Sequence, residues 1–261
     1  MNYLLDVWEE TKHLFINPVF LMTDFDGTLV PIEPSPEVVE LSKEMKNLFQ
    51  KLVSYCPIGV ISGRALDDLK EKIDVDGIYY SGNHGFELQG PNLSFIKEEA
   101  RQTEEIIGKI CDDIRKETRD IDGVLIENKK YTASFHYRLV SEDVVPKLKK
   151  ILREKTEPYR EQKVIKTNYG KKVFEISPAV DWDKGKALSL LNRVAGVEEG
   201  SLTVYLGDDI TDEDAFYKIK KTGIGILVSS EKRETAAKFL LKDSKEVKIF
   251  FRKLLDLLSK T

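Results

Sequence analysis

Residues 18–28, Pro-Val-Phe-Leu-Met-Thr-Asp-Phe-Asp-Gly-Thr, join a short apolar run to an abrupt acidic turn. A run of this length that ends in turn residues is typical of a strand buried on both faces of a parallel sheet. Open α/β sheets bind their ligands at the carboxyl ends of the strands, which is where Asp24 and Asp26 come. The stretch therefore predicts an α/β fold with two carboxylates at its ligand-binding edge.

Apolar strands alternate with amphipathic helices on both sides of this stretch, from the N-terminus to about residue 81 and again after residue 177. Such alternation indicates a parallel sheet with helices on both faces. The helices that we expect are 3–14, 36–55, 65–73, 184–195 and one near 214, and the strands are 18–23, 57–61, 78–81, 202–206 and 223–228.

The middle of the chain has a different pattern, with short hairpin-like strands in place of buried parallel runs. Two of its strands are joined by Glu127-Asn-Lys-Lys, which resembles a hairpin connection. The expected elements are helices 97–118 and 144–155 and strands 124–126, 133–138, 164–167 and 172–176. We therefore predict a core of residues 1–87 and 177–261, interrupted by an α+β insert, 88–176, whose open-faced sheet carries helices on one side.

Composition excludes several classes of partner. The chain has 261 residues, with 41 Lys and Arg against 45 Asp and Glu, so it has no broad basic field for nucleic acid. Its first residues lack the basic and apolar regions of a secretory signal, and no stretch approaches the roughly 20 apolar residues that span a bilayer. Cys56 and Cys111 have no metal-site or redox spacing. We expect a cytoplasmic protein with no membrane or nucleic-acid partner.

The residue pair Asp24 and Asp26 suits phosphoryl transfer. One carboxylate can attack phosphorus, while its neighbour protonates the leaving oxygen and later takes a proton from water. The alternative is an acidic turn that caps a helix. Ser62-Gly63-Arg64 ends the second strand, where its hydroxyl, backbone N–H groups and guanidinium can hold phosphate oxygens. That turn can equally be a helix N-cap.

A second acidic cluster, Gly-Asp-Asp-Ile-Thr-Asp-Glu-Asp at 207–214, follows another apolar strand. Mg²⁺ prefers oxygen ligands and takes one or two carboxylates together with phosphate and water, so Asp24 and Asp208 can share one ion. Capping of a helix N-terminus is the alternative for Glu213 and Asp214. Lys184 opens a helix, and a phosphate beside several aspartates needs such a cation.

In order, DFDGT at 24–28, SGR at 62–64, DKGKA at 183–187 and GDDITDED at 207–214 resemble the four motifs of the haloacid dehalogenase superfamily of phosphohydrolases. The resemblance implies a Rossmann-like core that works through an aspartyl-phosphate. It makes Asp24 the nucleophile and Asp26 the general acid and base. The roles that it further implies are phosphoryl binding by Ser62 and Lys184, and a Mg²⁺ site formed by Asp24, the Asp26 carbonyl and Asp208, with Asp209 and Asp212 in the same acidic motif.

The resemblance narrows on SGNHGFE at 81–87, ENKKYTASFHYR at 127–138 and KKVFEISP at 171–178, which are similar to trehalose-phosphate phosphatases. This implies trehalose 6-phosphate as substrate and a possible synthase partner. The insert would be a cap that closes over the sugar. Residues implied or expected to contact the substrate are Arg64, His84, Glu127, Lys129, Arg138, Lys171 and Glu175. Family members often carry an arginine after the last cap strand, where this chain has Ile176-Ser177-Pro178.

Other functions fit the same motifs. A related capped phosphatase would act on sucrose phosphate, mannosylphosphoglycerate or a hexose phosphate with a different lid. A phosphomutase would need a phosphorylated aspartate that resists water. A sugar-phosphate sensor, or a regulatory subunit of a synthase, would keep the fold and lose turnover, but intact Asp24, Asp26, Lys184 and Asp208 favour an enzyme.

Overall fold

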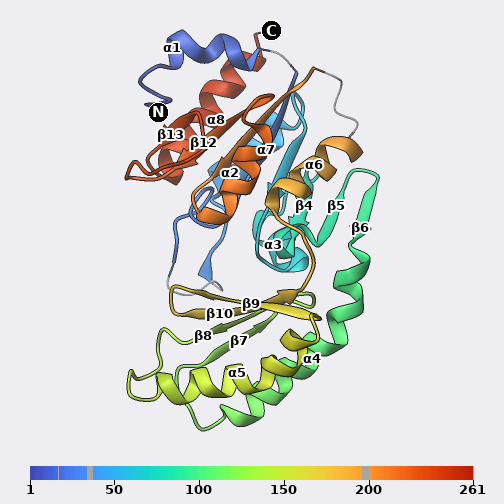
Figure 1. Cartoon of the computed structure of the whole chain (residues 1–261). Helices are drawn as coiled ribbons and strands as arrows, with labels where there is room; N and C mark the ends of the chain where they lie inside the picture. The colour runs from blue at the N-terminus through green and yellow to red at the C-terminus, as the bar shows by residue number, and fades with distance from the viewer. Residues whose placement is uncertain (17, 34–37, 196–199, 261) are drawn as a thin grey trace. The chain divides into compact units, whose positions relative to one another are not determined.

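The computed structural model describes residues 1–16, 18–33, 38–195 and 200–260, which form two compact units (Figure 1). Residues 1–95 and 182–261 make the first unit and residues 96–181 the second. The sequence predicted these boundaries at 87/88 and 176/177. The first division comes later because β5 (Glu87–Gly90) pairs antiparallel with β4 (Tyr79–Gly82) and β6 (Leu93–Ile96) pairs with β5, which extends the first sheet.

The first unit is built on one nine-stranded sheet of order β1-β13-β12-β11-β2-β3-β4-β5-β6. Its other strands are β1 (Asn2–Tyr3), β2 (Val19–Thr23), β3 (Ile58–Ile61), β11 (Leu202–Gly207), β12 (Gly223–Val228) and β13 (Phe239–Leu241). In this spatial order, every pair of neighbouring strands from β1 through β13, β12, β11, β2 and β3 to β4 is parallel. β2 lies in the middle between β3 and β11, so the carboxyl ends of these three strands meet at one edge. The predicted parallel core is confirmed.

Helices cover both faces of this sheet, and the alternation of β2 explains why. Val19 and Leu21 belong to one hydrophobic cluster, while Phe20 and Met22 belong to the other. The first cluster takes apolar side chains from α1 (Trp8–Thr11), α2 (Lys43–Leu52), α3 (Leu66–Ile73) and α8 (Ser244–Leu258), and the second from α6 (Lys184–Val194) and α7 (Glu213–Ile219). A strand buried on both sides therefore separates two cores.

Two predicted helices differ in the structure. The segment 3–14 is not one helix, because Asn2 and Tyr3 pair with β13, and α1 and a 3-10 helix (Lys12–Phe15) follow. The helix expected over 36–55 begins only at Lys43, where the Ser42 hydroxyl accepts a hydrogen bond from the Met45 N–H at 3.3 Å. Its predicted start, within 34–37, lies outside the described residues.

The second unit is a four-stranded antiparallel sheet of order β7-β8-β10-β9 with two helices. Its elements are α4 (Glu98–Glu117), β7 (Leu125–Asn128), β8 (Ala133–His136), α5 (Val145–Glu161), β9 (Ile165–Gly170) and β10 (Val173–Pro178). Phe135 and Phe174 lie opposite each other and share one hydrophobic cluster with α4 and α5. Both helices lie on one side of this sheet (Figure 1), so the predicted open-faced insert is confirmed.

Both cysteines are buried free thiols. Burial raises the pKa of Cys56 to about 12 and that of Cys111 to about 11, so neither is a thiolate nucleophile at neutral pH. Within the described part of the chain, every helix is too short or too polar to cross a membrane.

Candidate active site

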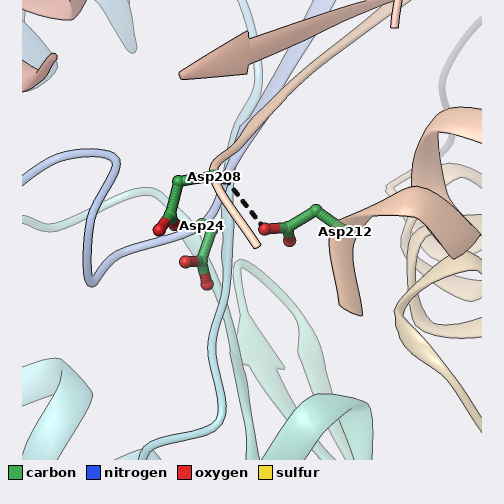
Figure 2. A group of neighbouring side chains, drawn as sticks. All are labelled: Asp24, Asp208 and Asp212. Atoms are coloured by element: carbon green, nitrogen blue, oxygen red, sulfur yellow. Dashed lines mark hydrogen bonds between the residues drawn. The ribbon is translucent and has the colours of Figure 1, made fainter. Parts of the chain in front are cut away.

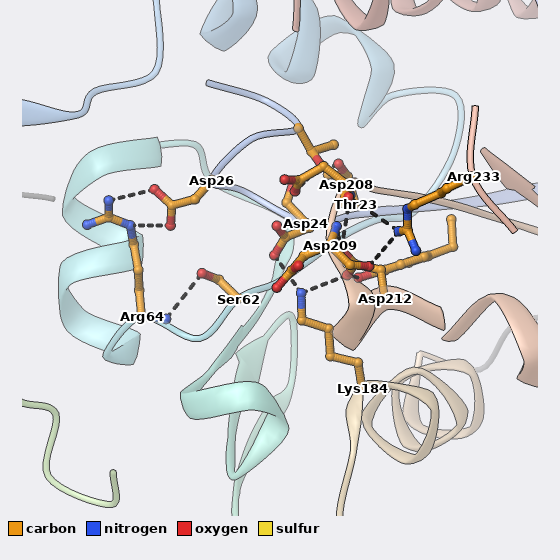
Figure 3. Close-up of polar contacts among 12 residues, drawn as sticks. Thr23, Asp24, Asp26, Ser62, Arg64, Lys184, Asp208, Asp209, Asp212 and Arg233 are labelled. Carbon is orange, nitrogen blue, oxygen red and sulfur yellow. Dashed lines mark hydrogen bonds and ion pairs between the residues drawn. The ribbon is translucent and has the colours of Figure 1, made fainter. Parts of the chain in front are cut away.

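Asp24 comes directly after β2, at the edge where the central strands end. Its backbone N–H donates to the Leu206 carbonyl at 2.8 Å, which fixes the turn against β11. The Asp24 side chain is buried, and Lys184 Nζ donates to its Oδ1 at 2.9 Å (Figure 3). Asp24, the predicted nucleophile, and Lys184, the predicted cation, are therefore in direct contact across 160 residues of chain.

Lys184 is the first residue of α6 and is only 4% exposed. Asp183 caps this helix by accepting from the Lys186 N–H at 2.8 Å, which holds the first turn of α6 at the strand ends. Lys184 Nζ also donates to Asp212 Oδ1 at 2.7 Å. One buried ammonium thus links two carboxylates, Asp24 and Asp212.

Asp212 is the most fully satisfied acid of the site. Besides Lys184, the Tyr205 hydroxyl donates to its Oδ1 at 2.6 Å. Its Oδ2 accepts the backbone N–H groups of Asp208 and Asp209, each at 3.0 Å. These contacts hold the acidic loop that follows β11 in one conformation, so Asp212 orients Asp208.

Asp24, Asp208 and Asp212 converge, and each offers a carboxylate oxygen within 4.8 Å of the others (Figure 2). The Thr28 hydroxyl donates to Asp208 Oδ1 at 3.2 Å. Gly27 has φ +80° and lies so close that an added Cβ would stand 2.1 Å from Asp208 Oδ2. The glycine therefore lets the first acidic turn approach the second one.

The electrostatics of this cluster favour a bound cation. Burial raises the pKa of Asp24 well above its usual range, and Lys184 offsets this only partly. Burial and the Asp212 charge raise the pKa of Asp208 to about 7. Burial would also raise the pKa of Asp212, but the charge and hydrogen bond of Lys184 lower it. One lysine does not balance three carboxylates, and this oxygen donor set fits a divalent metal ion.

Asp26 points away from this cluster toward Arg64 (Figure 3). Arg64 donates through Nε and Nη2 to the two Asp26 oxygens, each at 2.7 Å, and through Nη1 to Asp68 at 2.9 Å. Ser62 is buried, and its hydroxyl accepts the Arg64 backbone N–H at 3.2 Å. Arg64, which is expected to bind substrate, contacts the predicted general acid and base, and its substrate contact stays a prediction.

His84 lies in a 3-10 turn, Asn83–Gly85, that packs on the Ser62 loop. Its backbone has φ 56°, a conformation that non-glycine residues rarely adopt, and its N–H donates to the Ser62 carbonyl at 2.9 Å. An added Cβ on Gly63 would stand 2.6 Å from the His84 ring. The turn therefore places the imidazole directly over the loop that carries Ser62.

Sequence reasoning missed three residues of the site: Thr28, Tyr205 and Arg233. Tyr205 is a hydroxyl-bearing residue in a mostly apolar strand that leads into the acidic cluster, and this position is a signal that the sequence contains. Arg233 has no such signal, yet its Nη2 donates to the Asp208 and Asp209 carbonyls at 3.3 and 3.0 Å. Asp209 itself is exposed and caps the 3-10 turn Ile210–Asp212.

The comparisons with known proteins agree with this geometry. Residues 22–245 match the protein family described as trehalose-phosphatase. The chain belongs to the trehalose-phosphatase family. The predicted resemblance is thereby confirmed, and members of this family are phosphoric monoester hydrolases.

Individual relatives cover most of the chain. Trehalose-phosphate phosphatase B of Arabidopsis thaliana is 33% identical over 256 residues, which are 93% of this chain and 68% of that protein. Probable trehalose-phosphate phosphatase E of the same plant is 35% identical, over 97% of this chain and 74% of its own. The crystal structure of a trehalose-6-phosphate phosphatase related protein superposes with a TM-score of 0.80 at 26% identity, covering 93% of this chain and 99% of that one.

In this member of the trehalose-phosphatase family, the second unit gathers polar side chains on one face of its sheet. Glu127 lies opposite Ser134, and Ser134 lies opposite Glu175, on three adjacent strands. Lys129 Nζ donates to the Ser134 hydroxyl at 2.8 Å, and a hydrogen bond of 2.8 Å joins His136 Nε2 to Glu127. Apolar residues of the same strands point to α4 and α5, so these groups form the open face.

Two other predicted sugar contacts in this insert of the trehalose-phosphatase chain, Arg138 and Lys171, lie outside the hydrogen-bonded group around Ser134. Arg138 and Lys171 are exposed, and their side chains make no hydrogen bond or ion pair to any residue in the described ranges. Sequence reasoning did not single out Ser134 and His136, although the strict alternation in ENKKYTASFHYR places them on the face of Glu127.

Proposed function

We propose that this chain hydrolyses trehalose 6-phosphate to trehalose and inorganic phosphate. The match to the trehalose-phosphatase family along residues 22–245 supports a sugar phosphate as the class of substrate. The observation that carries the chemistry is the buried contact of Asp24 with Lys184 at the carboxyl end of β2. A carboxylate held there beside a cation is suited to attack an anionic phosphoryl group.

In the proposed reaction, an Asp24 oxygen bonds to phosphorus and the bond from phosphorus to the sugar oxygen breaks. The electron pair of that bond stays on the sugar oxygen, which takes a proton from Asp26. A water molecule then attacks the phosphorus of the aspartyl-phosphate while Asp26 removes its proton, which frees Asp24 and inorganic phosphate. Ser62 and Lys184 bind the phosphoryl oxygens during both steps.

Asp24, Asp208 and the backbone carbonyl of Asp26 would hold Mg²⁺. When bound, the ion supplies positive charge that lowers the repulsion between the nucleophile and the phosphate. Asp212 takes part through its hydrogen bonds, since it orients the Asp208 loop and pairs with Lys184. The different pKa shifts of the two acids support these two roles, a metal ligand for Asp208 and a positioning residue for Asp212, because the pKa is raised for Asp208 and lowered for Asp212.

The open face of the second unit is the proposed sugar-recognition surface. A disaccharide presents many hydroxyl groups, which carboxylates and cations bind well. The residues of this unit proposed for the role are Glu127, Lys129, Arg138, Lys171 and Glu175, and a separate substrate contact is proposed for His84 in the first unit. A cytoplasmic location and association with a synthase stay predictions.

Phosphate release from a panel of esters tests the substrate. Trehalose 6-phosphate, sucrose phosphate, mannosylphosphoglycerate and glucose 6-phosphate should be compared with Mg²⁺ and with excess chelator. We expect trehalose 6-phosphate to react fastest and chelation to stop turnover reversibly. A tenfold preference for glucose 6-phosphate would refute trehalose 6-phosphate as the substrate. Full activity in excess chelator would refute the proposed Mg²⁺ site. An isomeric phosphate as product, in place of free sugar, would indicate a phosphomutase.

The nucleophile is tested separately. Asp24→Asn should abolish turnover while the chain still folds, because the amide fills the same space without attacking phosphorus. Retained activity would remove Asp24 from that role. Tight binding of trehalose 6-phosphate by the unmodified chain, without any phosphate released in Mg²⁺, would instead favour a sugar-phosphate sensor that has lost turnover.

A further inference from the structure

The Arg64 guanidinium is held on several sides. Its side chain is 7% exposed, and it makes a two-point contact with Asp26 and a third contact with Asp68 on α3. It also lies 5.3 Å from the centroid of the Phe25 ring, within reach of a cation–π interaction. Charge, hydrogen bonds and packing therefore keep the guanidinium in one orientation.

The backbone of Arg64 is fixed as well. Its N–H donates to the Ser62 hydroxyl at 3.2 Å, and its carbonyl accepts the Asn83 N–H at 2.7 Å. Asn83 is buried, and its side-chain amide donates a hydrogen bond to the Glu87 carboxylate at 2.9 Å. Arg64 thus connects Asp26 to a rigid part of the sheet edge, through the loop that carries Ser62.

We propose that Arg64 is a positioning residue for Asp26, a role that rests on the proposed function. The Asp26 side chain is 39% exposed, so Arg64 holds it from one side and leaves the other side open to the sugar oxygen. When the proton of Asp26 passes to that oxygen, a carboxylate remains, and the guanidinium beside it stabilises the new charge. Lysine cannot reproduce this two-point contact.

The role predicts that the effect of Arg64→Lys depends on the leaving group. With trehalose 6-phosphate, whose alkoxide must be protonated, kcat should fall by about 100-fold, in the range of general acid–base catalysis. With 4-nitrophenyl phosphate, whose leaving group needs no proton, we expect a fall of no more than about 3-fold, far below the contribution of a general acid. Inhibition by inorganic phosphate should stay unchanged, since a residue that only positions Asp26 makes no contact with the phosphoryl group.

A matched control is Arg160→Lys. Arg160 makes the same two-point contact, with Glu157, but on the exposed surface of α5. Its replacement should leave both esters unaffected. If Arg64→Lys does not fold, Asp68→Asn loosens the same guanidinium and should give a smaller loss, confined to trehalose 6-phosphate.

Three results would overturn the role. An equal loss on both esters, with weaker inhibition by phosphate, would make Arg64 a phosphoryl ligand. Full additivity of Asp26→Asn and Arg64→Lys in melting temperature would show that the two side chains do not interact, whereas we expect the second change to have less effect after the first. An unmodified chain that releases phosphate from neither ester would refute the proposed function and this role with it.

Discussion

Replacing Lys184 with methionine should destabilise the metal-free chain strongly. Methionine has a similar length and fills the space, so the change removes charge and hydrogen bonds without opening a large cavity. Lys184 is 4% exposed, and its partners Asp24 and Asp212 have side chains 9% and 0% exposed. Both carboxylates would lose their cation in a place that water hardly reaches.

Breaking a buried ion pair costs about 3–5 kcal/mol. The lower end applies here, because Asp212 keeps the Tyr205 hydroxyl and two backbone N–H donors. We therefore expect a loss of about 3 kcal/mol at neutral pH, or a fall in melting temperature of about 6–12 °C for a chain of this size. Lys184 lowers the pKa of Asp212 below its usual value of 3.8, so this stabilisation is fully present above pH 3.8, and the loss should shrink only as the pH falls below 3.8.

Calorimetry and urea unfolding in excess chelator measure this loss. Lys155→Met is the matched control, because Lys155 pairs with Glu117 at 2.9 Å on the exposed surface and should change the melting temperature little. Adding Asp24→Asn to the Lys184 variant should restore part of the stability, since one unpaired charge is removed. A loss below about 1 kcal/mol at neutral pH, the size of an exposed pair, would refute the buried-pair interpretation.

Four further predictions concern the metal and the sugar. Burial raises the pKa of Asp208 from 3.8 to about 7, so the metal-free chain should lose stability as the pH rises through that window. Mg²⁺ should therefore raise the melting temperature more at about pH 8 than at about pH 5.5. An equal rise at both pH values would contradict the assignment of Asp208 as a metal ligand. Gly27→Ala should abolish the Mg²⁺-dependent rise, because its Cβ would collide with Asp208; an unchanged rise in thermal scans would count against that close approach. Arg233→Ala should raise by about 10-fold the Mg²⁺ concentration that gives half of the increase in melting temperature, because residues that hold metal ligands in place typically change metal affinity by this much. Thermal scans over a range of Mg²⁺ concentrations measure this shift, and an unchanged midpoint would contradict the prediction. Glu127→Ala and Arg138→Ala should raise KM for trehalose 6-phosphate and leave 4-nitrophenyl phosphate unaffected; equal effects on both would disprove sugar recognition.

Local patterns were sufficient to predict the architecture of the core. An apolar strand that ends in acidic or small polar residues occurs after residues 23, 61 and 206, and parallel pairing must bring such ends to one edge. The hairpin-like strands in the middle of the chain likewise predicted an open-faced sheet with helices on one side. Burial and backbone geometry impose these patterns on neighbouring residues, so a single sequence contains them.

Which charge meets which partner was decided only by the tertiary structure. Lys184 reaches both Asp24 and Asp212, Arg64 pairs with Asp26, and Arg233 binds the carbonyls of the acidic loop. The additions of β1, β5 and β6 to the sheet were equally hidden. Such contacts join groups far apart in the chain and depend on differences of less than an ångström in reach, and spacing along a sequence does not contain that information.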